Sequence, residues 1–297
     1  MANAASDRQD ACSCLVAQVP DPLPVVGFLR GKPVEAVLDL VPRLFNLCRE
    51  AQTQAMRLAF GLDLPDPEAI YREIKREHVL KLAVTLPHAL GMAPIDFPRG
   101  DNADLTLALF GAARFPETEA QFEAFLQSGQ GIAPVLAEVS RRFAPQEAVV
   151  SRLPAAWDSV IFSNQALENS VAARHIDHPV MRYVETRYGR GPLWRIVARA
   201  LDLEAVTDRR LPGPRKIAEG TVVVPAARGL YAVKVQVEDG KLADMVRMTP
   251  TDHLLARGGI MEQSLATLPR NKHDHSKAVL SILDPCVPVQ ITEQNDA

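Results

Sequence analysis

Cysteine is scarce in this sequence. Only four of 297 residues are cysteine, Cys12, Cys14, Cys48 and Cys286, which is too few for a disulfide-stabilised scaffold of this length. None of them belongs to a Cys-x-x-Cys pair, so the sequence offers neither a zinc ribbon nor a thioredoxin-type redox motif. Sparse thiols are typical of a reducing compartment, and we therefore expect a cytoplasmic protein.

Long apolar runs and a strong charge imbalance are also lacking. No stretch approaches the ~18 consecutive apolar residues of a membrane-spanning helix, and the N-terminus has no basic segment followed by an apolar core, as a secretory signal would. The formal net charge is −3, so electrostatics favours neither nucleic acid nor an anionic membrane as a partner. No glycine-rich nucleotide-binding motif occurs. With 47% apolar and 23% charged residues, the sequence is that of a globular chain with a sizeable core.

Helical patterns dominate the first two thirds of the chain. Between residues 33 and 61, apolar residues recur at alternating steps of four and three, which predicts one amphipathic helix with Cys48 on its apolar stripe. A second helix is predicted from 67 to 90, opened by a capping aspartate and a proline. Shorter helices interrupted by proline and glycine follow up to residue 143, and two more are predicted between 179 and 203.

In the last third of the chain the spacing of apolar residues changes. Residues 221–249 alternate apolar with other side chains around Glu238-Asp239-Gly240-Lys241, a tight-turn sequence that predicts strands joined in a hairpin. Residues 259–266 and 276–283 return to helical spacing, and Asp284-Pro285-Cys286 ends the second of these helices, whereas 144–177 show no clear pattern. The first 24 residues mix small, polar and proline residues without any period, and we expect them to form a flexible leader that contains Cys12 and Cys14.

These patterns predict an α-rich α+β fold. We expect a single domain over residues 25–297, in which a helical layer (33–204) combines with a small antiparallel β hairpin region (221–249) and the C-terminal helices (252–297).

Cys48 and Cys286 are the two thiols whose surroundings can be interpreted. A cysteine on an apolar helical stripe, like Cys48, is commonly an inert buried residue. Cys286 follows Asp284-Pro285 at a predicted helix end, where unsatisfied backbone groups can accommodate a reactive or coordinating thiolate. The residues alone leave both interpretations open. Lys272-His273-Asp274-His275 could also bind a metal, but a solvated loop is the preferred interpretation.

Short motifs around these cysteines form an ordered series. They are Leu29-Arg30-Gly31-Lys32-Pro33, Arg43-Leu44-Phe45-Asn46-Leu47-Cys48, Ala226-Ala227-Arg228-Gly229-Leu230, Asp239-Gly240-Lys241, Pro250-Thr251 and Asp284-Pro285-Cys286-Val287-Pro288-Val289. From about Leu29 to Ile291, this series resembles a shortened and degenerate large subunit of the nickel-iron hydrogenases. Gln52 and Thr292 stand where that family has histidines.

The resemblance implies a metal site from which half of the ligands are missing. In the family, two pairs of cysteines hold nickel, and two of the four thiolates also bridge to an iron that carries cyanide and carbon monoxide, because soft sulfur suits these metals. Phe45 and Val289 occupy the positions of the partner cysteines. Cys48, at a bridging position, and Cys286, at a terminal one, remain as candidate metal ligands.

Three further residues enter the candidate site through the same resemblance. Arg228, Pro250 and Thr251 correspond to residues around the diatomic ligands, and a guanidinium is a suitable donor to cyanide nitrogen. Hydrogen cleavage and nickel binding are not expected, because two thiols are insufficient for the usual bimetallic centre and the Arg-x-Glu-Gly-His segment of catalytic subunits is missing. The chain ends 297 − 292 = 5 residues after Thr292, so no maturation cleavage is expected.

The resemblance therefore indicates a non-catalytic accessory protein of hydrogenase biosynthesis. It would hold an iron with cyanide and carbonyl ligands transiently and pass it to the hydrogenase large subunit, with maturation chaperones and that subunit as partners. One alternative is a metal-free mimic of the large subunit that binds maturation proteins or protects the immature enzyme from oxygen. A third hypothesis is a thiol redox protein that forms a disulfide between Cys48 and Cys286.

Overall fold

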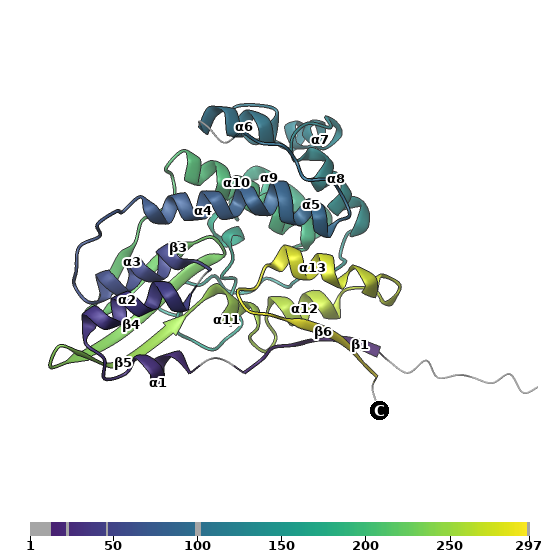
Figure 1. Ribbon diagram of the computed structural model, residues 1–297. Helices are drawn as coiled ribbons and strands as arrows, with labels where there is room; N and C mark the ends of the chain where they lie inside the picture. The colour runs from purple at the N-terminus through teal and green to yellow at the C-terminus, as the bar shows by residue number, and fades with distance from the viewer. Residues whose placement is uncertain (1–12, 22–23, 46, 99–101, 296–297) are drawn as a thin grey trace, which may run out of the picture.

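The computed structural model describes residues 13–21, 24–45, 47–98 and 102–295 (Figure 1). Its α-helices are α1 Val25–Leu29, α2 Val34–Leu44, α3 Arg49–Ala59, α4 Ala69–Leu80, α5 Leu86–Ala89, α6 Asn102–Phe110, α7 Glu119–Gln127, α8 Ala133–Arg142, α9 Pro179–Tyr188, α10 Pro192–Thr207, α11 Pro250–Leu254, α12 Ile260–Ala266 and α13 Ser276–Leu283. Its strands are β1 Ser13–Gln18, β2 Arg215–Ala218, β3 Thr221–Ala226, β4 Gly229–Glu238, β5 Lys241–Met248 and β6 Gln290–Asn295. The predicted α-rich α+β class is confirmed. No helix of the described residues is long and apolar enough to cross a membrane.

Helix α10 lies at the centre of the helical layer. Every residue from Pro192 to Val206 is buried, and the helix packs against α4, α8, α9 and α13 (Figure 1). A helix covered on all sides is normally apolar throughout, yet this one carries four buried charged residues, Arg195, Arg199, Asp202 and Glu204. Each has an oppositely charged partner on another segment or beyond the helix end. Buried charges need such pairing, so α10 fixes its neighbours by polar contacts as well as by packing.

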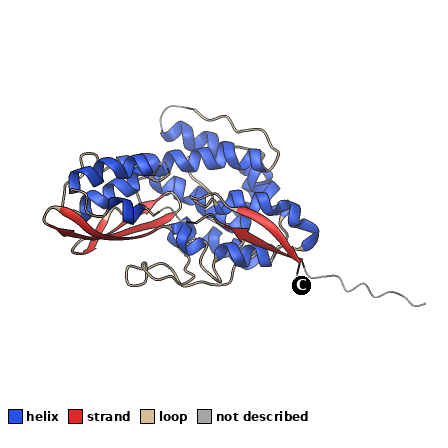
Figure 2. Ribbon diagram, turned by 60° about the horizontal axis from the view of Figure 1, so that its bottom comes forward, coloured by secondary structure: helices blue, strands red, loops and turns tan. Residues whose placement is uncertain are grey.

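The four-stranded sheet is antiparallel in the order β2-β3-β4-β5, and α3 packs against β3 and β4 (Figure 2). The predicted hairpin is confirmed: β4 and β5 are joined at Asp239 and Gly240, which both have positive φ (50° and 72°), as a two-residue turn of the type I′ class requires. A second two-residue turn, Ala227-Arg228, joins β3 to β4. This turn presents Arg228 at one end of the sheet.

The prediction of one continuous helix over 33–61 is wrong, because α2 ends at Leu44 and α3 begins at Arg49. Cys48 is the N-cap of α3 in the left-handed conformation (φ 52°, ψ 40°). The first N–H groups of a new helix need acceptors, and the Glu73 carboxylate of α4 accepts from Glu50 N (2.8 Å) and Ala51 N (3.3 Å). This long-range acceptor stabilises a helix start that the apolar period does not reveal.

Two predictions about the chain ends also need correction. Residues 13–18 lie in the expected flexible leader but form strand β1, which pairs with β6 from Ser13 opposite Asn295 to Gln18 opposite Gln290. Residues 290–295 lie beyond the predicted helix end at Asp284-Pro285, within the segment assigned to the C-terminal helices (252–297), and supply strand β6. Leu15, Ala17 and Ile291 pack against the buried cluster of α11 and α12, so partner residues more than 270 positions away determine both strands. Cys12 lies outside the described residues, and Cys14 is exposed.

Candidate two-thiol site

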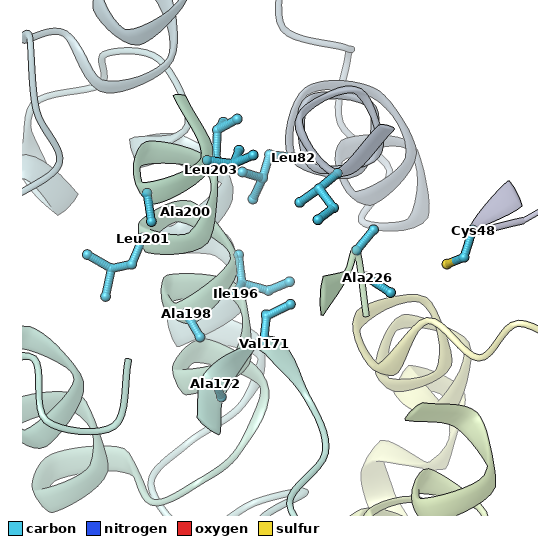
Figure 3. Packing of buried hydrophobic residues seen from close by; sticks show 14 of the residues in the cluster. Cys48, Leu82, Val171, Ala172, Ile196, Ala198, Ala200, Leu201, Leu203 and Ala226 are labelled. Carbon is cyan, nitrogen blue, oxygen red and sulfur yellow. The ribbon is translucent and has the colours of Figure 1, made fainter. Parts of the chain in front are cut away.

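The structure brings Cys48 and Cys286 together. Cys48 is 7% exposed at the start of α3, and Cys286 lies in the loop after α13 and is half-buried. Figure 3 shows the Cys48 side chain at the edge of the buried cluster, beside Ala226. The two thiols interact: the contact with Cys48 lowers the pKa of Cys286 to about 7, and the contact with Cys286 together with burial raises the pKa of Cys48. The first proton of the pair is therefore lost from Cys286 near neutral pH, whereas Cys48 keeps its proton.

Arg228 contacts both segments that carry the thiols. Its Nη1 donates to Cys48 Sγ at 3.5 Å, and its Nε donates to the backbone oxygen of Asp284 at 3.0 Å. Its side chain is 9% exposed. A guanidinium holds several donors in one plane, so Arg228 links α3 to the loop of Cys286 and places positive charge next to the sulfurs, where it also lowers the pKa of Cys286.

Asp284 lies two residues before Cys286, and three cationic side chains surround its carboxylate. Lys81 lies at 2.8 Å, Arg228 at 3.1 Å and Arg199 at 3.2 Å from its oxygens. Although burial opposes ionisation, these cations lower the pKa of Asp284 to about 2. Asp284 is the left-handed residue that ends α13 (φ 56°), a conformation that side chains other than glycine seldom adopt. The ion pairs stabilise this backbone turn, which directs the chain to Cys286.

The charges around the thiols are balanced in number but not in position. Lys81, Arg199 and Arg228 carry three positive charges, and Asp284, Glu77 and Glu73 carry three negative ones, with Glu77 3.6 Å from Arg228 and Glu73 at the start of α3. All six residues are largely buried, so water screens these charges weakly. Arg228 lowers the pKa of Cys286, whereas Glu73 raises that of Cys48, so the arrangement favours a thiolate at Cys286.

Pro250 and Thr251 begin α11 next to Cys286. The Thr251 hydroxyl oxygen accepts from Cys286 N at 2.9 Å, and hydrogen bonding by this side chain contributes to the lowered pKa of Cys286. Helix α11 is fixed by a capping box between Thr249 and Asp252. A pocket lined by Pro250, Thr251, Arg228 and Asp284 adjoins the site. The three non-thiol residues singled out from the sequence therefore share one location with the two cysteines.

The side chains that the resemblance sets at the positions of the family's other ligands pack elsewhere. Phe45 packs against the core, and the guanidinium of Arg247 lies 4.6 Å from its ring centroid. Val289 packs with the cluster beneath β1 and β6. Gln52 donates to the carbonyl of Leu47 at 3.3 Å. No group of three or more His, Cys, Asp or Glu residues suited to a metal ion occurs among the described residues, so the protein contributes two thiols at this place.

Most of the charged residues that support these thiols stand outside the sequence motifs. Glu77, Lys81 and Arg199 were not singled out, and Asp284 was noted only as part of a motif. The usable signal was Arg199, a charged residue within an apolar helical pattern. The segment Lys272–His275 lies in a short 3-10 helix, where His273 hydrogen-bonds Glu293 at 2.9 Å and Lys272 pairs with Glu147, so these side chains are bound to neighbours.

Solved structures define the class of fold. The chain is similar to the nickel-iron-selenium hydrogenase of D. vulgaris Hildenborough in the as-isolated oxidised state (TM-score 0.56, 13% identity, 92% of this chain and 98% of the other) and to the nickel-iron-selenium hydrogenase of Dm. baculatum (TM-score 0.56, 14% identity, 92% and 99%). The fold is that of a nickel-iron hydrogenase large subunit.

A curated relative gives the family. The chain is 45% identical over 277 residues, covering 92% of its own length and 91% of the other, to the hydrogenase expression/formation protein HupK of Rhodobacter capsulatus. No family model matches the chain. At this identity and coverage, the chain belongs to the HupK family of hydrogenase expression/formation proteins.

Proposed function

We propose that this protein is a non-catalytic scaffold of hydrogenase maturation whose cargo is an iron that carries cyanide and carbonyl ligands. The observation that carries the proposal is the placement of Cys48 and Cys286 around the Arg228 guanidinium, which donates to Cys48 Sγ and to the backbone oxygen of Asp284. Thiolates are suitable ligands for low-valent iron, and the guanidinium of Arg228 is a suitable hydrogen-bond donor for cyanide nitrogen. Cyanide and thiolate are anions, so the positive charge of Arg228 beside Cys48 favours such cargo.

Two thiols suit a protein that must release what it holds. Four thiolates fix a bimetallic centre, whereas two leave the remaining coordination positions of an iron to its own small ligands. Both sulfurs would bind one metal ion at the ~2.3 Å bond length typical of thiolates, and the mutual influence of the two thiols on their pKa values supports such a shared site. We propose that the maturation proteins which supply the fragment and the hydrogenase large subunit that receives it are the partners, in agreement with the name of the HupK relative.

Infrared spectroscopy tests this function. Protein purified anaerobically from cells that express the maturation machinery should show cyanide and carbonyl stretching bands. Cys48→Ala and Cys286→Ala should abolish them, whereas Cys14→Ala, which changes an exposed thiol on β1, should leave them unchanged. Absence of the bands from the unaltered protein, with all variants alike, would overturn the proposal.

The likeness to large subunits over more than nine tenths of the chain favours a second candidate. A metal-free mimic of the large subunit would occupy maturation proteins or protect the immature enzyme from oxygen. A variant with Cys48→Ser and Cys286→Ser separates the two functions. A mimic should keep its partners in a pull-down and still complement a deletion strain, whereas a scaffold should lose complementation.

A further inference from the structure

The turn that presents Arg228 is held by a segment in which the sequence shows no pattern. Arg174, at the end of a 3-10 turn over Val171–Arg174, donates through Nη2 to the carbonyl oxygen of Ala226 at 2.8 Å and also to that of Gly229. Ala226 and Gly229 flank the two-residue turn Ala227-Arg228. One guanidinium nitrogen therefore bonds to the backbone on both sides of Arg228.

Arg174 is itself fixed by a buried carboxylate. Its Nη1 donates to Asp202 at 2.7 Å, and Asp202 lies in the central helix α10 with none of its side chain exposed. The same carboxylate is hydrogen-bonded by His78 and His175, each at 2.8 Å. Charge-assisted hydrogen bonds of this kind are the strong ones in proteins. Asp202 therefore holds Arg174 by an ion pair and is itself held by two histidines.

Asn169 adds a second contact between the same segment and the turn. Its Oδ1 accepts from Leu230 N at 2.8 Å, and its Nδ2 donates to Leu230 O at 3.0 Å. The approach is close: a Cβ on Gly229 would lie 2.3 Å from the backbone oxygen of Asn169, so only glycine fits there. The segment and the turn are therefore joined both through Arg174 and through Asn169.

We propose that Arg174 is a positioning residue for the two-thiol site, which anchors the β3–β4 turn so that the Arg228 guanidinium faces Cys48 and Asp284. The inference adds a positioning residue to the proposed function, and the purpose of that residue rests on the proposed function. The described hydrogen bonds and ion pairs of Arg174 go to Asp202 and to the turn backbone, with none to a thiol, Thr251 or Asp284, so Arg174 acts through Arg228. Lysine cannot replace it, since a point charge cannot reproduce a planar fork that binds a carboxylate and two carbonyls at once.

The test follows the Arg228 side chain directly in metal-free protein. The Nε–H of Arg228 is hydrogen-bonded to Asp284, so its nitrogen-15 NMR signal, assigned by its loss in Arg228→Lys, should exchange slowly with water. In Arg174→Lys we expect this signal to shift and to exchange about tenfold faster or more. Arg190→Lys is the matched control, because Arg190 is also buried (6% exposed) and paired with Glu185 on α9. An unchanged Arg228 signal in a folded Arg174→Lys protein would overturn the inference.

A second measurement covers the case in which Arg174→Lys does not fold. In the unaltered protein, backbone amides of 227–230 should exchange with deuterium at least about tenfold more slowly than those of the exposed Asp239-Gly240 turn, because only the former is anchored by Arg174 and Asn169. Equal rates would contradict the anchoring. Neither measurement requires iron. Missing infrared bands would therefore contradict the proposed iron cargo, whereas the positioning role of Arg174 would still be decided by these two exchange measurements.

Discussion

Replacing Cys286 with serine should remove a pH-dependent part of the protein's stability. Hydrogen bonding to Cys48 and the charge of Arg228 lower the pKa of Cys286 from 9.0 to about 7, and a serine hydroxyl does not ionise in this range. The folded state binds the Cys286 proton less tightly than the unfolded state, so the stabilisation is complete above pH 9 and is lost as the pH falls through 7. These two pKa values correspond to about 0.1 kcal/mol at pH 6 and about 1.4 kcal/mol at pH 8.

Urea unfolding under reducing conditions at pH 6, 7 and 8 measures this contribution. The difference in unfolding free energy between the unaltered protein and Cys286→Ser should grow by about 1.3 kcal/mol from pH 6 to pH 8. Cys14→Ser should show no such growth, because Cys14 is exposed. The raised pKa of Cys48 acts in the opposite direction and only above about pH 9, where stability falls again with rising pH. A difference that stays constant across this range would refute the placement of a thiolate beside Arg228.

Three further changes test separate parts of the site. Arg228→Ala leaves Asp284 with Lys81 and Arg199 alone, so the free energy of unfolding should fall by about 3 kcal/mol. Alkylation of Cys286 at pH 7 should also slow, and an unchanged alkylation rate would count against an interaction between Arg228 and Cys286. Thr251→Val removes the acceptor for Cys286 N–H and should cost about 1–3 kcal/mol, most of which Thr251→Ser should restore; equal loss in both variants would mean that the hydroxyl is unimportant. Deleting residues 1–18 removes the partner of β6, so amides of 290–295 should exchange rapidly with deuterium; continued protection would show that β6 is held by packing alone.

The sequence predicted those parts of the fold that local pattern determines. The Asp239-Gly240 turn followed from residues that tolerate positive φ, and the long helical segments followed from their apolar period. The break at Cys48 could not be predicted, since it depends on the Glu73 carboxylate reaching across from α4. Strands β1 and β6 were also missed, because each is determined by a partner at the other end of the chain.

The candidate site likewise contains residues that the sequence could predict and residues that it could not. Cys48, Cys286, Arg228 and the pair Pro250-Thr251 stand in motifs and could be named from their order along the chain. Their support could not, because Asp202 and Arg199 lie on a helix whose burial on all sides appears only in three dimensions. Arg174 and Asn169 come from a stretch without periodicity, where side-chain to backbone contacts, rather than secondary structure, determine the conformation.

The central claim is that both thiols bind one iron, and X-ray absorption at the iron edge measures this most directly. Protein loaded in cells with the maturation machinery should show about two sulfur neighbours at ~2.3 Å from the iron, together with the short iron-carbon distances of its small ligands. Cys48→Ala and Cys286→Ala should each reduce the sulfur count or prevent loading. An iron spectrum without sulfur neighbours, or one that both variants leave unchanged, would contradict the account.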